Sequence, residues 1–405
     1  MLFRAEPQVL KVFNAQNGRT GSFSEGELER LKKYVLDGEE NLFVKRLREL
    51  GLLPNRQDQY EVERCLAHIA QIGTCKGIEG ASRVPDALHI DVTTRCPLKC
   101  PQCYKLYGNE VDLPIKALKV LVDEARQIGV FQIAIGGGEP LLYEKLEEGI
   151  DYITTQGLAC TLTTSGYKMD LTVVEKLINA GLNHLQISLN GSSEAINQLS
   201  RDGYGYAIEA MKALKKYGNN VSWGINWVAR KDNIHDLESL LSLIHFYGAG
   251  NINILRYKPT MGEDYDEIAL EEKDYESLMD TIRRIRGITV RMDSAFSFLL
   301  CKLYAHQTES IVAGCGAGRN FMVVDPMGRF KPCSHRKEIS SGGQSILDYW
   351  TNDKDLKKIR GLKERSNSKC TTCLYLSRCR GCQVIEDREK NKMCMAYSKG
   401  EKNDV

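Results

Sequence analysis

Three cysteines lie close together in one short stretch of the chain. Cys96, Cys100 and Cys103 are separated by three and then two residues, and they follow an apolar, strand-like run at 87–92. Three thiolates on one loop hold three corners of a four-iron cluster, whereas iron–sulfur clusters normally take four cysteine ligands. One iron is then open to a ligand that is not protein. A zinc site is the alternative, although structural zinc is usually bound by paired cysteines from two places.

A glycine-rich turn follows the second predicted strand. Gly137, Gly138, Glu139 and Pro140 come directly after Gly136 and an apolar run that precedes it. Glycine lets the backbone approach a ligand closely because it lacks a Cβ, and a carboxylate beside it suits a bound ammonium group. A run of glycines is by default an ordinary turn. Its position one strand after the cysteine loop favours a ligand site instead.

A second group of cysteines is concentrated after residue 314. Its seven members are Cys315, Cys333, Cys370, Cys373, Cys379, Cys382 and Cys394. The two CX2C pairs at 370–373 and 379–382 are by themselves enough for one zinc site. Seven cysteines are too many for a single zinc ion, so the group favours more than one metal centre.

The composition limits the function classes. The chain has 405 residues, and its 55 basic and 53 acidic residues give a formal net charge of +2. This balance provides no general attraction to nucleic acid or to an anionic membrane, and we expect neither as a partner. The N-terminus lacks the apolar core of a signal peptide, and no apolar run is long enough to span a bilayer. We therefore expect a cytoplasmic protein. Because thiols stay reduced in that compartment, its fourteen cysteines are better interpreted as metal ligands than as disulfide partners.

Short apolar runs alternate with amphipathic helical segments from about residue 87 to residue 291. This pattern predicts an α/β fold of repeated βα units around a parallel sheet. The six predicted strands are Leu88–Val92, Phe131–Ile135, Ala159–Thr164, His184–Leu189, Val221–Val228 and Asn251–Tyr257. Six units suit a partial (βα)6 barrel better than a closed barrel of eight. Active-site groups of such folds lie at the C-terminal ends of the strands, where the cysteine loop is placed.

The chain before the barrel has a different pattern, which predicts a small winged-helix-like domain. Its predicted elements are a hairpin of Val9–Phe13 and Thr20–Phe23 and two helices, Glu25–Leu36 and Glu40–Leu50. Ser24 is the expected cap of the first helix, and Gly51 ends the second. Mixed charges on these helices disfavour DNA binding. The expected domains are residues 1–85, the barrel at 86–295 and a cysteine-rich iron–sulfur domain at 296–405.

Together, the cysteine triad and the Gly137-Gly138-Glu139 turn resemble the radical S-adenosylmethionine (SAM) superfamily, over the whole βα region. The resemblance implies that the triad binds a catalytic [4Fe–4S] cluster whose open iron chelates the amino and carboxylate groups of S-adenosyl-L-methionine. The glycine turn then holds the amino group. It also implies a reducing electron donor such as flavodoxin or ferredoxin, and a 5′-deoxyadenosyl radical that abstracts a hydrogen atom from the substrate.

Further cofactor contacts follow from the same resemblance. The turn Thr164-Ser165-Gly166 resembles the family's ribose-side turn, and residues 188–191 resemble a Ser-x-Asp-Gly turn with asparagine in place of aspartate. The candidate contacts are Ser165, Ser188, Asn190, Arg201 and Tyr104. The family commonly has an aromatic residue before the third cysteine, where this chain has Gln102. The alternative to a cofactor contact is that the polar side chains at the strand ends and the arginine are ordinary surface residues.

The C-terminal cysteines resemble the SPASM extension of peptide-modifying radical enzymes, which carries two auxiliary [4Fe–4S] clusters. Carried over by position, one cluster is held by Cys370, Cys373, Cys379 and Cys394. The other is held by only three thiolates, from Cys315, Cys333 and Cys382. Its remaining iron is then open to a substrate thiolate, or it is closed by Cys301.

These resemblances imply a maturase that modifies a ribosomally synthesised precursor peptide. The N-terminal unit resembles precursor-recognition elements, which bind a leader peptide as an added strand at an exposed sheet edge. Hydrogen abstraction followed by bond formation to a cysteine thiolate would give a thioether. The enzymatic alternatives are a C–C cross-link, an epimerisation, and a non-peptide substrate such as a haem precursor. A non-catalytic iron–sulfur carrier or a zinc-stabilised transcription factor is a hypothesis of another class.

Overall fold

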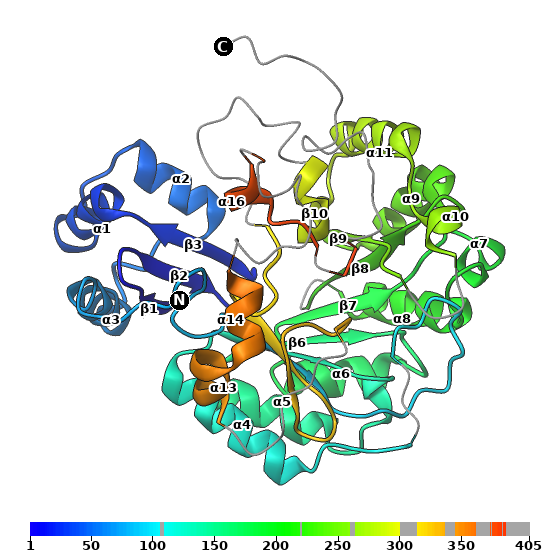
Figure 1. The fold of residues 1–405 in the computed structure, drawn as a ribbon, viewed down its shortest axis with the longest axis horizontal. Helices are drawn as coiled ribbons and strands as arrows, with labels where there is room; N and C mark the ends of the chain where they lie inside the picture. Colours follow the sequence, from blue (N-terminus) through cyan, green and yellow to red (C-terminus); the bar gives the residue numbers. More distant parts are fainter. Residues whose placement is uncertain are drawn as a thin grey trace.

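The computed structural model describes residues 1–105, 109–218, 221–259, 264–299, 314–336, 345–361, 373, 375–382 and 384–385. Within these residues the chain forms a nine-stranded sheet with surrounding helices and a three-stranded sheet near the N-terminus (Figure 1). Cys301, Cys370 and Cys394, which the sequence analysis singled out, lie outside the described residues.

Six parallel strands form the middle of the large sheet in chain order. They are β4 (Ala87–Asp91), β5 (Gln132–Gly136), β6 (Ala159–Thr164), β7 (His184–Ser188), β8 (Ser222–Ala229) and β9 (Asn251–Arg256). Each pairs in parallel with the next. The predicted α/β fold of six βα units is confirmed, and no strand end differs from its prediction by more than one residue.

Further strands extend the sheet on both sides. β10 (Thr289–Met292) pairs in parallel with β9, and β11 (Phe321–Val324) pairs in parallel with β4. β12 (Phe330–Lys331) is antiparallel to β11. Among the described strands β10 and β12 are the two ends of the sheet, so the barrel is partial. Because β11 lies beyond residue 296, part of the predicted C-terminal domain shares the barrel sheet, and the domain boundaries remain predictions.

Helices return the chain between strands and cover the outer face of the sheet (Figure 1). They are α4 (Ile115–Ile128), α5 (Leu146–Thr155), α6 (Leu171–Asn179), α7 (Glu194–Gln198), α8 (Tyr204–Tyr217), α9 (Leu237–Tyr247), α10 (Tyr265–Ile268) and α11 (Glu272–Arg284). In α4, Leu118, Val122 and Ala125 recur at helical spacing and are buried, and Gly129 ends the helix in the left-handed conformation. No described helix is both long and apolar enough to cross a membrane.

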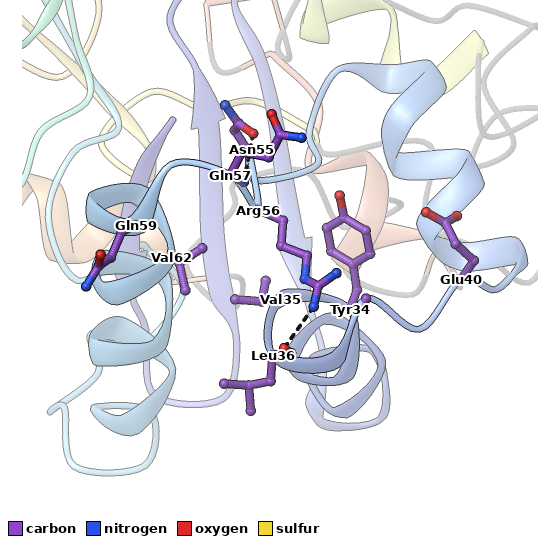
Figure 2. Close-up of a pocket in the computed structure, with 10 residues that line it drawn as sticks. Tyr34, Val35, Leu36, Glu40, Asn55, Arg56, Gln57, Gln59 and Val62 are labelled. Carbon is purple, nitrogen blue, oxygen red and sulfur yellow. Dashed lines mark hydrogen bonds between the residues drawn. The ribbon is translucent and has the colours of Figure 1, made fainter.

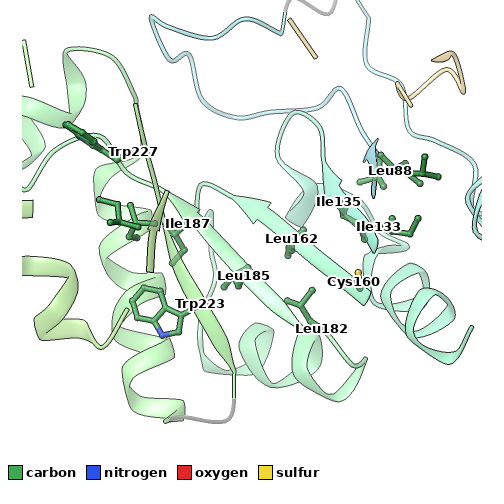
Figure 3. Packing of buried hydrophobic residues seen from close by; sticks show 14 of the residues in the cluster. Leu88, Ile133, Ile135, Cys160, Leu162, Leu182, Leu185, Ile187, Trp223 and Trp227 are labelled. Carbon is green, nitrogen blue, oxygen red and sulfur yellow. The ribbon is translucent and has the colours of Figure 1, made fainter. Parts of the chain in front are cut away.

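The main hydrophobic core lies between the sheet and these helices. Figure 3 shows members from neighbouring strands, among them Leu88, Ile133, Leu162, Leu185 and Trp223. All five are buried, and burial of a side chain of this size contributes about 1.5–3 kcal/mol. The core therefore fixes the strands relative to one another, and with them the loops that follow their C-terminal ends.

In the N-terminal unit an antiparallel sheet packs with three helices. Its elements are β1 (Leu2–Ala5), β2 (Leu10–Asn14), β3 (Arg19–Phe23), α1 (Glu25–Asp37), α2 (Leu42–Leu50) and α3 (Gln59–Ala70). The predicted hairpin and the first two helices are confirmed, and Ser24 caps α1 in a capping box with Glu27. α2 begins two residues later than predicted because Asn41 caps it, accepting from the Val44 N–H at 3.0 Å. β1 and α3 were not predicted.

A buried arginine fixes the N-terminal unit to the barrel. Arg4 is 1% exposed and donates to the carbonyl oxygens of Pro85 and Gly129, both at 3.1 Å. Its guanidinium also pairs with Asp86 and lies 4.6 Å from the ring centre of Phe131. These partners lie beside the N-terminal ends of β4 and β5, away from the edge that carries the cysteine loop. The N-terminal unit is therefore attached at the N-terminal ends of the strands, and the cysteine loop lies at the opposite, C-terminal ends.

A cavity of about 610 Å³ opens in the N-terminal unit, and Figure 2 shows its lining. The lining residues are Tyr34, Val35, Leu36, Gly38, Glu40, Asn55, Arg56, Gln57, Gln59 and Val62. Arg56 spans it, with Nη2 donating to the carbonyl oxygen of Leu36 at 3.2 Å. No cysteine is among the ten lining residues, so this cavity is distinct from the cysteine sites.

Candidate functional site

The first cysteine loop leaves the C-terminal end of β4, as predicted for an active-site loop. Burial raises the pKa of the Cys96 thiol, and the nearby thiols of Cys100 and Cys103 raise it further, so the three sulfurs are neighbours. In the described part of the chain no three His, Cys, Asp or Glu side chains converge on a point suited to one metal ion. A four-iron cluster binds its thiolates at separate corners. The spread of the triad therefore fits a cluster better than a single zinc ion.

Backbone and charged groups around the triad oppose part of the effect of burial on its thiols. The N–H of Leu98 donates to Cys96 and that of Asp202 donates to Cys100. Burial raises the pKa of the Cys100 thiol, and the guanidinium of Arg201 opposes this. The Nε of Arg201 is buried and has no hydrogen-bond partner among the described residues. A cation with a free donor beside the loop suits an anionic ligand. The predicted contact of Arg201 with the cofactor agrees with this and stays a prediction.

The glycine turn packs directly against the backbone that leads into the cysteine loop. The N–H of Gly138 donates to the Thr93 carbonyl at 2.7 Å, and the N–H of Glu139 donates to the Arg95 carbonyl at 2.7 Å. A Cβ on Gly137 would lie 2.5 Å from the Thr93 carbonyl oxygen, and one on Gly138 would collide with the Arg95 carbonyl. Glycine is required here by this close backbone contact, a reason that the sequence did not indicate.

Glu139 is a buried carboxylate surrounded by neutral donors. It is 1% exposed, and it accepts from the Thr164 hydroxyl at 2.5 Å and from the Ser165 N–H at 2.8 Å. The Ser165 hydroxyl and the Leu141 N–H are its other donors, and no cationic side chain pairs with it in the described residues. A buried charge without an opposite charge is costly. The site therefore fits a ligand that brings an ammonium group.

The remaining candidate contacts have different surroundings. Ser165 holds Glu139 rather than facing open space. The Asn190 amide is fully buried, donating to the Ser200 hydroxyl at 2.8 Å and accepting from the Val228 N–H at 3.0 Å. Ser188 ends β7 and is 8% exposed. Since the Asn190 amide is used within the protein, its contact with a cofactor remains a prediction, as do those of the two serines.

Three cysteines of the second group come together from distant parts of the chain. Burial raises the pKa of the Cys315 thiol to about 12, and the thiols of Cys382 and Cys333 raise it further. Each sulfur accepts an N–H from the residue two positions later: Ala317 for Cys315, His335 for Cys333 at 3.5 Å, and Val384 for Cys382. Repeated N–H donors to neighbouring sulfurs suit a metal–thiolate site. Their role as cluster ligands remains a prediction.

The other predicted auxiliary set is only partly described. Cys373 and Cys379 lie on either side of the start of α16 (Leu376–Cys379), where the Leu376 N–H donates to the Cys373 carbonyl at 3.0 Å. The other two members of that set lie outside the described residues. The assignment of this second auxiliary cluster therefore remains a prediction.

Tyr104 joins the two cysteine sites. It directly follows Cys103, and its ring packs against that of His335 with the ring centres 3.9 Å apart and the planes tilted by 32°. His335 is two residues after Cys333, and burial lowers its pKa to about 3, so the ring is neutral at neutral pH. The structure places Tyr104 against the second site, and its predicted contact with the cofactor remains a prediction.

Two ion pairs at this edge of the barrel were not predicted. Lys105, just after the loop, lies 2.6 Å from Asp91 at the end of β4. Lys258, after β9, lies 2.5 Å from Asp293, after β10. Each side chain is at most 17% exposed. Only Lys258 directly follows a predicted strand, and the pairing in both cases depends on how the strands are arranged.

Comparison with known proteins gives a family match for the barrel. Residues 90–244 match the Radical SAM superfamily. The chain is 26% identical over 313 residues to PqqA peptide cyclase of Rhodopseudomonas palustris, covering 72% of this chain and 80% of that protein. It is 28% identical over 311 residues to the mycofactocin maturase MftC of Mycolicibacterium smegmatis, covering 73% and 77%. An AdoMet-dependent heme synthase of Methanosarcina barkeri is 24% identical over 327 residues, covering 75% and 92%.

The fold is also similar to a solved structure along nearly its whole length. Streptococcus suis SuiB bound to precursor peptide SuiA superimposes with a TM-score of 0.70 at 20% sequence identity, covering 97% of this chain and 98% of that one. At this identity the likeness concerns the fold. It extends beyond the barrel to the N-terminal unit.

Proposed function

This chain is an enzyme of the radical SAM superfamily, and from that premise we propose that it modifies a ribosomally synthesised precursor peptide. Two relatives, which each match more than two thirds of this chain, are named as a peptide cyclase and a mycofactocin maturase. That similarity is the observation that carries the proposal. The solved structure of SuiB bound to precursor peptide SuiA has a fold that matches 97% of this chain, and it supports the same proposal.

The superfamily uses a [4Fe–4S] cluster and S-adenosyl-L-methionine. We assign the cluster to Cys96, Cys100 and Cys103 and the amino group of the cofactor to Glu139, because that buried carboxylate lacks a cation of its own. When bound, these groups supply a carbon radical that abstracts a hydrogen atom from the substrate. A reductant such as flavodoxin or ferredoxin and a reducing compartment such as the cytoplasm suit this chemistry.

The second cysteine site indicates which bond the enzyme would form in its substrate. Cys315, Cys333 and Cys382 offer three neighbouring thiols, and the contact of Tyr104 in the first cysteine loop with His335, two residues after Cys333, supports this proposal. With three protein thiolates, an auxiliary cluster has a corner for the thiolate of a substrate cysteine. We therefore propose a thioether as the product. We assign a second auxiliary cluster to the set that contains Cys373 and Cys379.

One specific observation favours a different substrate class. The heme synthase relative matches 75% of this chain, so a haem precursor is the alternative to a peptide. Among peptide products, a C–C cross-link or an epimerised residue requires no thiolate at the second site. The thiol content of the product separates a thioether from both of these outcomes.

The proposed function predicts a defined change in mass. A cysteine-containing peptide encoded beside this gene, incubated without oxygen with reduced enzyme and S-adenosyl-L-methionine, should lose two hydrogen atoms and one free thiol. Tandem mass spectrometry after iodoacetamide treatment measures both. The same peptide with its cysteines replaced by serine is the matched control and should stay unmodified. Loss of two hydrogens with all thiols still alkylated would indicate a C–C cross-link. An unchanged mass would indicate epimerisation if acid hydrolysis and chiral chromatography find a D-residue, and would contradict the maturase proposal if they find none.

We propose that the leader segment of the peptide binds along β3. Among the described strands β3 pairs only with β2, and four of its five residues are not buried. β1, at the other edge, lies against α3. An extended peptide that pairs with a free edge strand gains backbone hydrogen bonds. β3 is therefore the edge that offers unpaired backbone groups.

Hydrogen exchange should locate the leader peptide. Addition of the leader should slow amide exchange at residues 19–23, because added hydrogen bonds protect those amides, and should leave residues 2–5 unchanged. Mass spectrometry of peptic fragments measures this, with a scrambled leader of the same composition as the control. Protection of residues 34–40 and 55–62 alone would instead place the leader in the cavity of Figure 2.

A further inference from the structure

The inner face of the large sheet, on the side away from the covering helices, carries polar side chains. Successive residues of a strand point to opposite faces. Core side chains such as Leu162, Leu185 and Ile225 pack with the helices, so the residues that alternate with them form the inner face. Polar members of this face are Gln132, Thr161, Thr163, Gln186, Asn226 and Asn253. A parallel sheet that is covered on both faces is apolar throughout, so these side chains indicate a face that is not a packed core.

Solvent reaches the inner face close to the proposed cofactor site. Thr163 is exposed, although its strand β6 lies between β5 and β7 in the middle of the sheet. The next residue, Thr164, donates to Glu139 at 2.5 Å. The inner face beside this buried carboxylate is therefore open to a ligand.

Two asparagines lie side by side on this face near the C-terminal ends of the strands. Asn226 of β8 pairs in register with Ser188 of β7 and with Asn253 of β9. The Nδ2 of Asn253 donates to the Oδ1 of Asn226 at 2.8 Å. The Nδ2 of Asn226 and the Oδ1 of Asn253 have no hydrogen-bond partner in the described part of the chain. The pair therefore offers one free donor and one free acceptor.

A peptide group is the complement of this pair. Its carbonyl oxygen accepts and its N–H donates, so it can bind the Nδ2 of Asn226 and the Oδ1 of Asn253 together. Strands β5 to β9 place no Asp, Glu, Lys or Arg on the inner face, and burial lowers the pKa of His184 there to about 4, so its ring is neutral. A haem precursor bears carboxylates, which need charged partners when buried. The inner face therefore suits a peptide backbone better.

The edge strand beside this pair contacts the N-terminal unit. Arg291 of β10 pairs in register with Asn253, and its Nη2 donates to the Asn17 carbonyl at 3.3 Å. Asn17 lies in the turn between β2 and β3, and β3 is the strand proposed above to bind the leader. The turn before that strand therefore touches the sheet beside the strand that carries Asn253, which supports a peptide as the occupant of the inner face.

We propose that Asn226 and Asn253 bind one peptide group in the core segment of the substrate and hold the adjoining residue beside the cofactor site. The inference rests on the proposed function, which makes the substrate a peptide, and it names two residues that bind it. Ser188, in the same row, ends β7 at the edge of the sheet that carries the cysteine loop. Because the two asparagines contact the backbone, this binding does not depend on the side chain of the substrate residue.

An amide-to-ester scan of the substrate tests this contact. An ester oxygen in place of one backbone N–H removes a donor and leaves every side chain unchanged. The probe is the cysteine-containing peptide encoded beside this gene, with reconstituted enzyme and S-adenosyl-L-methionine. One ester position should weaken its binding about fivefold, as for loss of one hydrogen bond. In Asn253→Leu the all-amide peptide should bind about fivefold more weakly, and the same ester should cause no further loss. Fluorescence anisotropy of the labelled peptide measures these affinities.

Asn179→Leu is the matched control, because it makes the same change at an exposed position at the end of α6. It should bind the all-amide and ester peptides as the wild type does. Asn253→Leu should still bind S-adenosyl-L-methionine, and it should release more 5′-deoxyadenosine per modified peptide because the substrate residue is held less well. If Asn253→Leu does not bind the cofactor, Asn226→Leu replaces it. An ester carbonyl is also a weaker acceptor, so the effect of the ester should shrink in that variant too.

The outcomes distinguish this inference from the proposed function. If the wild type binds and modifies the peptide, but the ester weakens binding as much in the asparagine variant as in the wild type, the inference is overturned and the proposed function stands. If the wild type releases 5′-deoxyadenosine but binds no peptide, the proposed function fails, and the inference fails with it.

Discussion

Replacement of Cys100 by alanine should stop the release of 5′-deoxyadenosine from the reduced, iron-reconstituted enzyme. Cys100 lies between the other two cysteines of the loop and accepts the Asp202 N–H, so its loss removes one corner of the proposed cluster. Two thiolates do not hold a four-iron cluster in place. We expect the rate of release to fall below about a thousandth of that of the wild type, as for loss of an essential catalytic group. Chromatography of the quenched reaction measures it.

Iron content separates this effect from general damage. Three four-iron clusters correspond to about twelve irons per chain, and Cys100→Ala should keep about eight. Cys75→Ala is the control, because Cys75 is outside both cysteine sites and its thiol donates to the Gln71 carbonyl. It should retain both the iron and the activity. Unchanged release in Cys100→Ala, or about four irons with zinc in the wild type, would contradict the cluster assignments.

The barrel strands could be predicted because each is marked by its own residues. Ala159–Thr164 was predicted with both ends correct, since an apolar, β-branched run stands between clear helical segments. β10 was not predicted. Its four residues alternate between exposed and half-buried positions, a pattern too weak to distinguish from a loop. β11 joins β4 from more than 200 positions later in the chain, and only the folded arrangement determines that pairing.

Within the candidate site, local motifs were predictable and the contacts between them were not. The cysteine triad and Glu139 were identified by spacing, but the reason for glycine at Gly138 came from its contact with Arg95. The pair of Lys258 and Asp293 joins residues from two strands, so no local pattern indicates it. The contact of Tyr104 with His335 likewise joins residues that are more than 200 positions apart in the chain.

The contact between Tyr104 and His335 has a consequence for the chemistry. Tyr104 is next to Cys103, and His335 is two residues from Cys333, so the loops that carry the two proposed clusters are in direct contact. A substrate residue that reaches the first site therefore lies near the second. Groups held close together react without the entropic cost of bringing separate reactants together. This proximity favours the proposed reaction, in which hydrogen abstraction uses the first site and bond formation uses the second.

The contact between the glycine turn and the cysteine loop can be tested with one methyl group. In Gly138→Ala the added Cβ collides with the carbonyl of Arg95 and lies 2.7 Å from that of Thr94, both of which are backbone atoms that cannot move aside separately. The turn should be displaced, and with it Glu139, whose N–H donates to the Arg95 carbonyl. We expect S-adenosyl-L-methionine binding to weaken about a hundredfold, since a charged hydrogen bond contributes about 1.5–3 kcal/mol and the overpacked turn adds strain.

Gly205→Ala is the matched control for this substitution. Gly205 lies near the start of α8 in the same barrel, its backbone angles are ordinary, and no atom lies within 4 Å of an added Cβ. Alanine there should leave cofactor binding unchanged and stabilise the fold by about 0.5–1 kcal/mol, because it restricts the unfolded chain. Isothermal titration calorimetry and thermal unfolding measure the two effects. If Gly138→Ala bound the cofactor as tightly as Gly205→Ala does, the turn would not position Glu139, and the ammonium site would have to be sought elsewhere on this edge of the barrel.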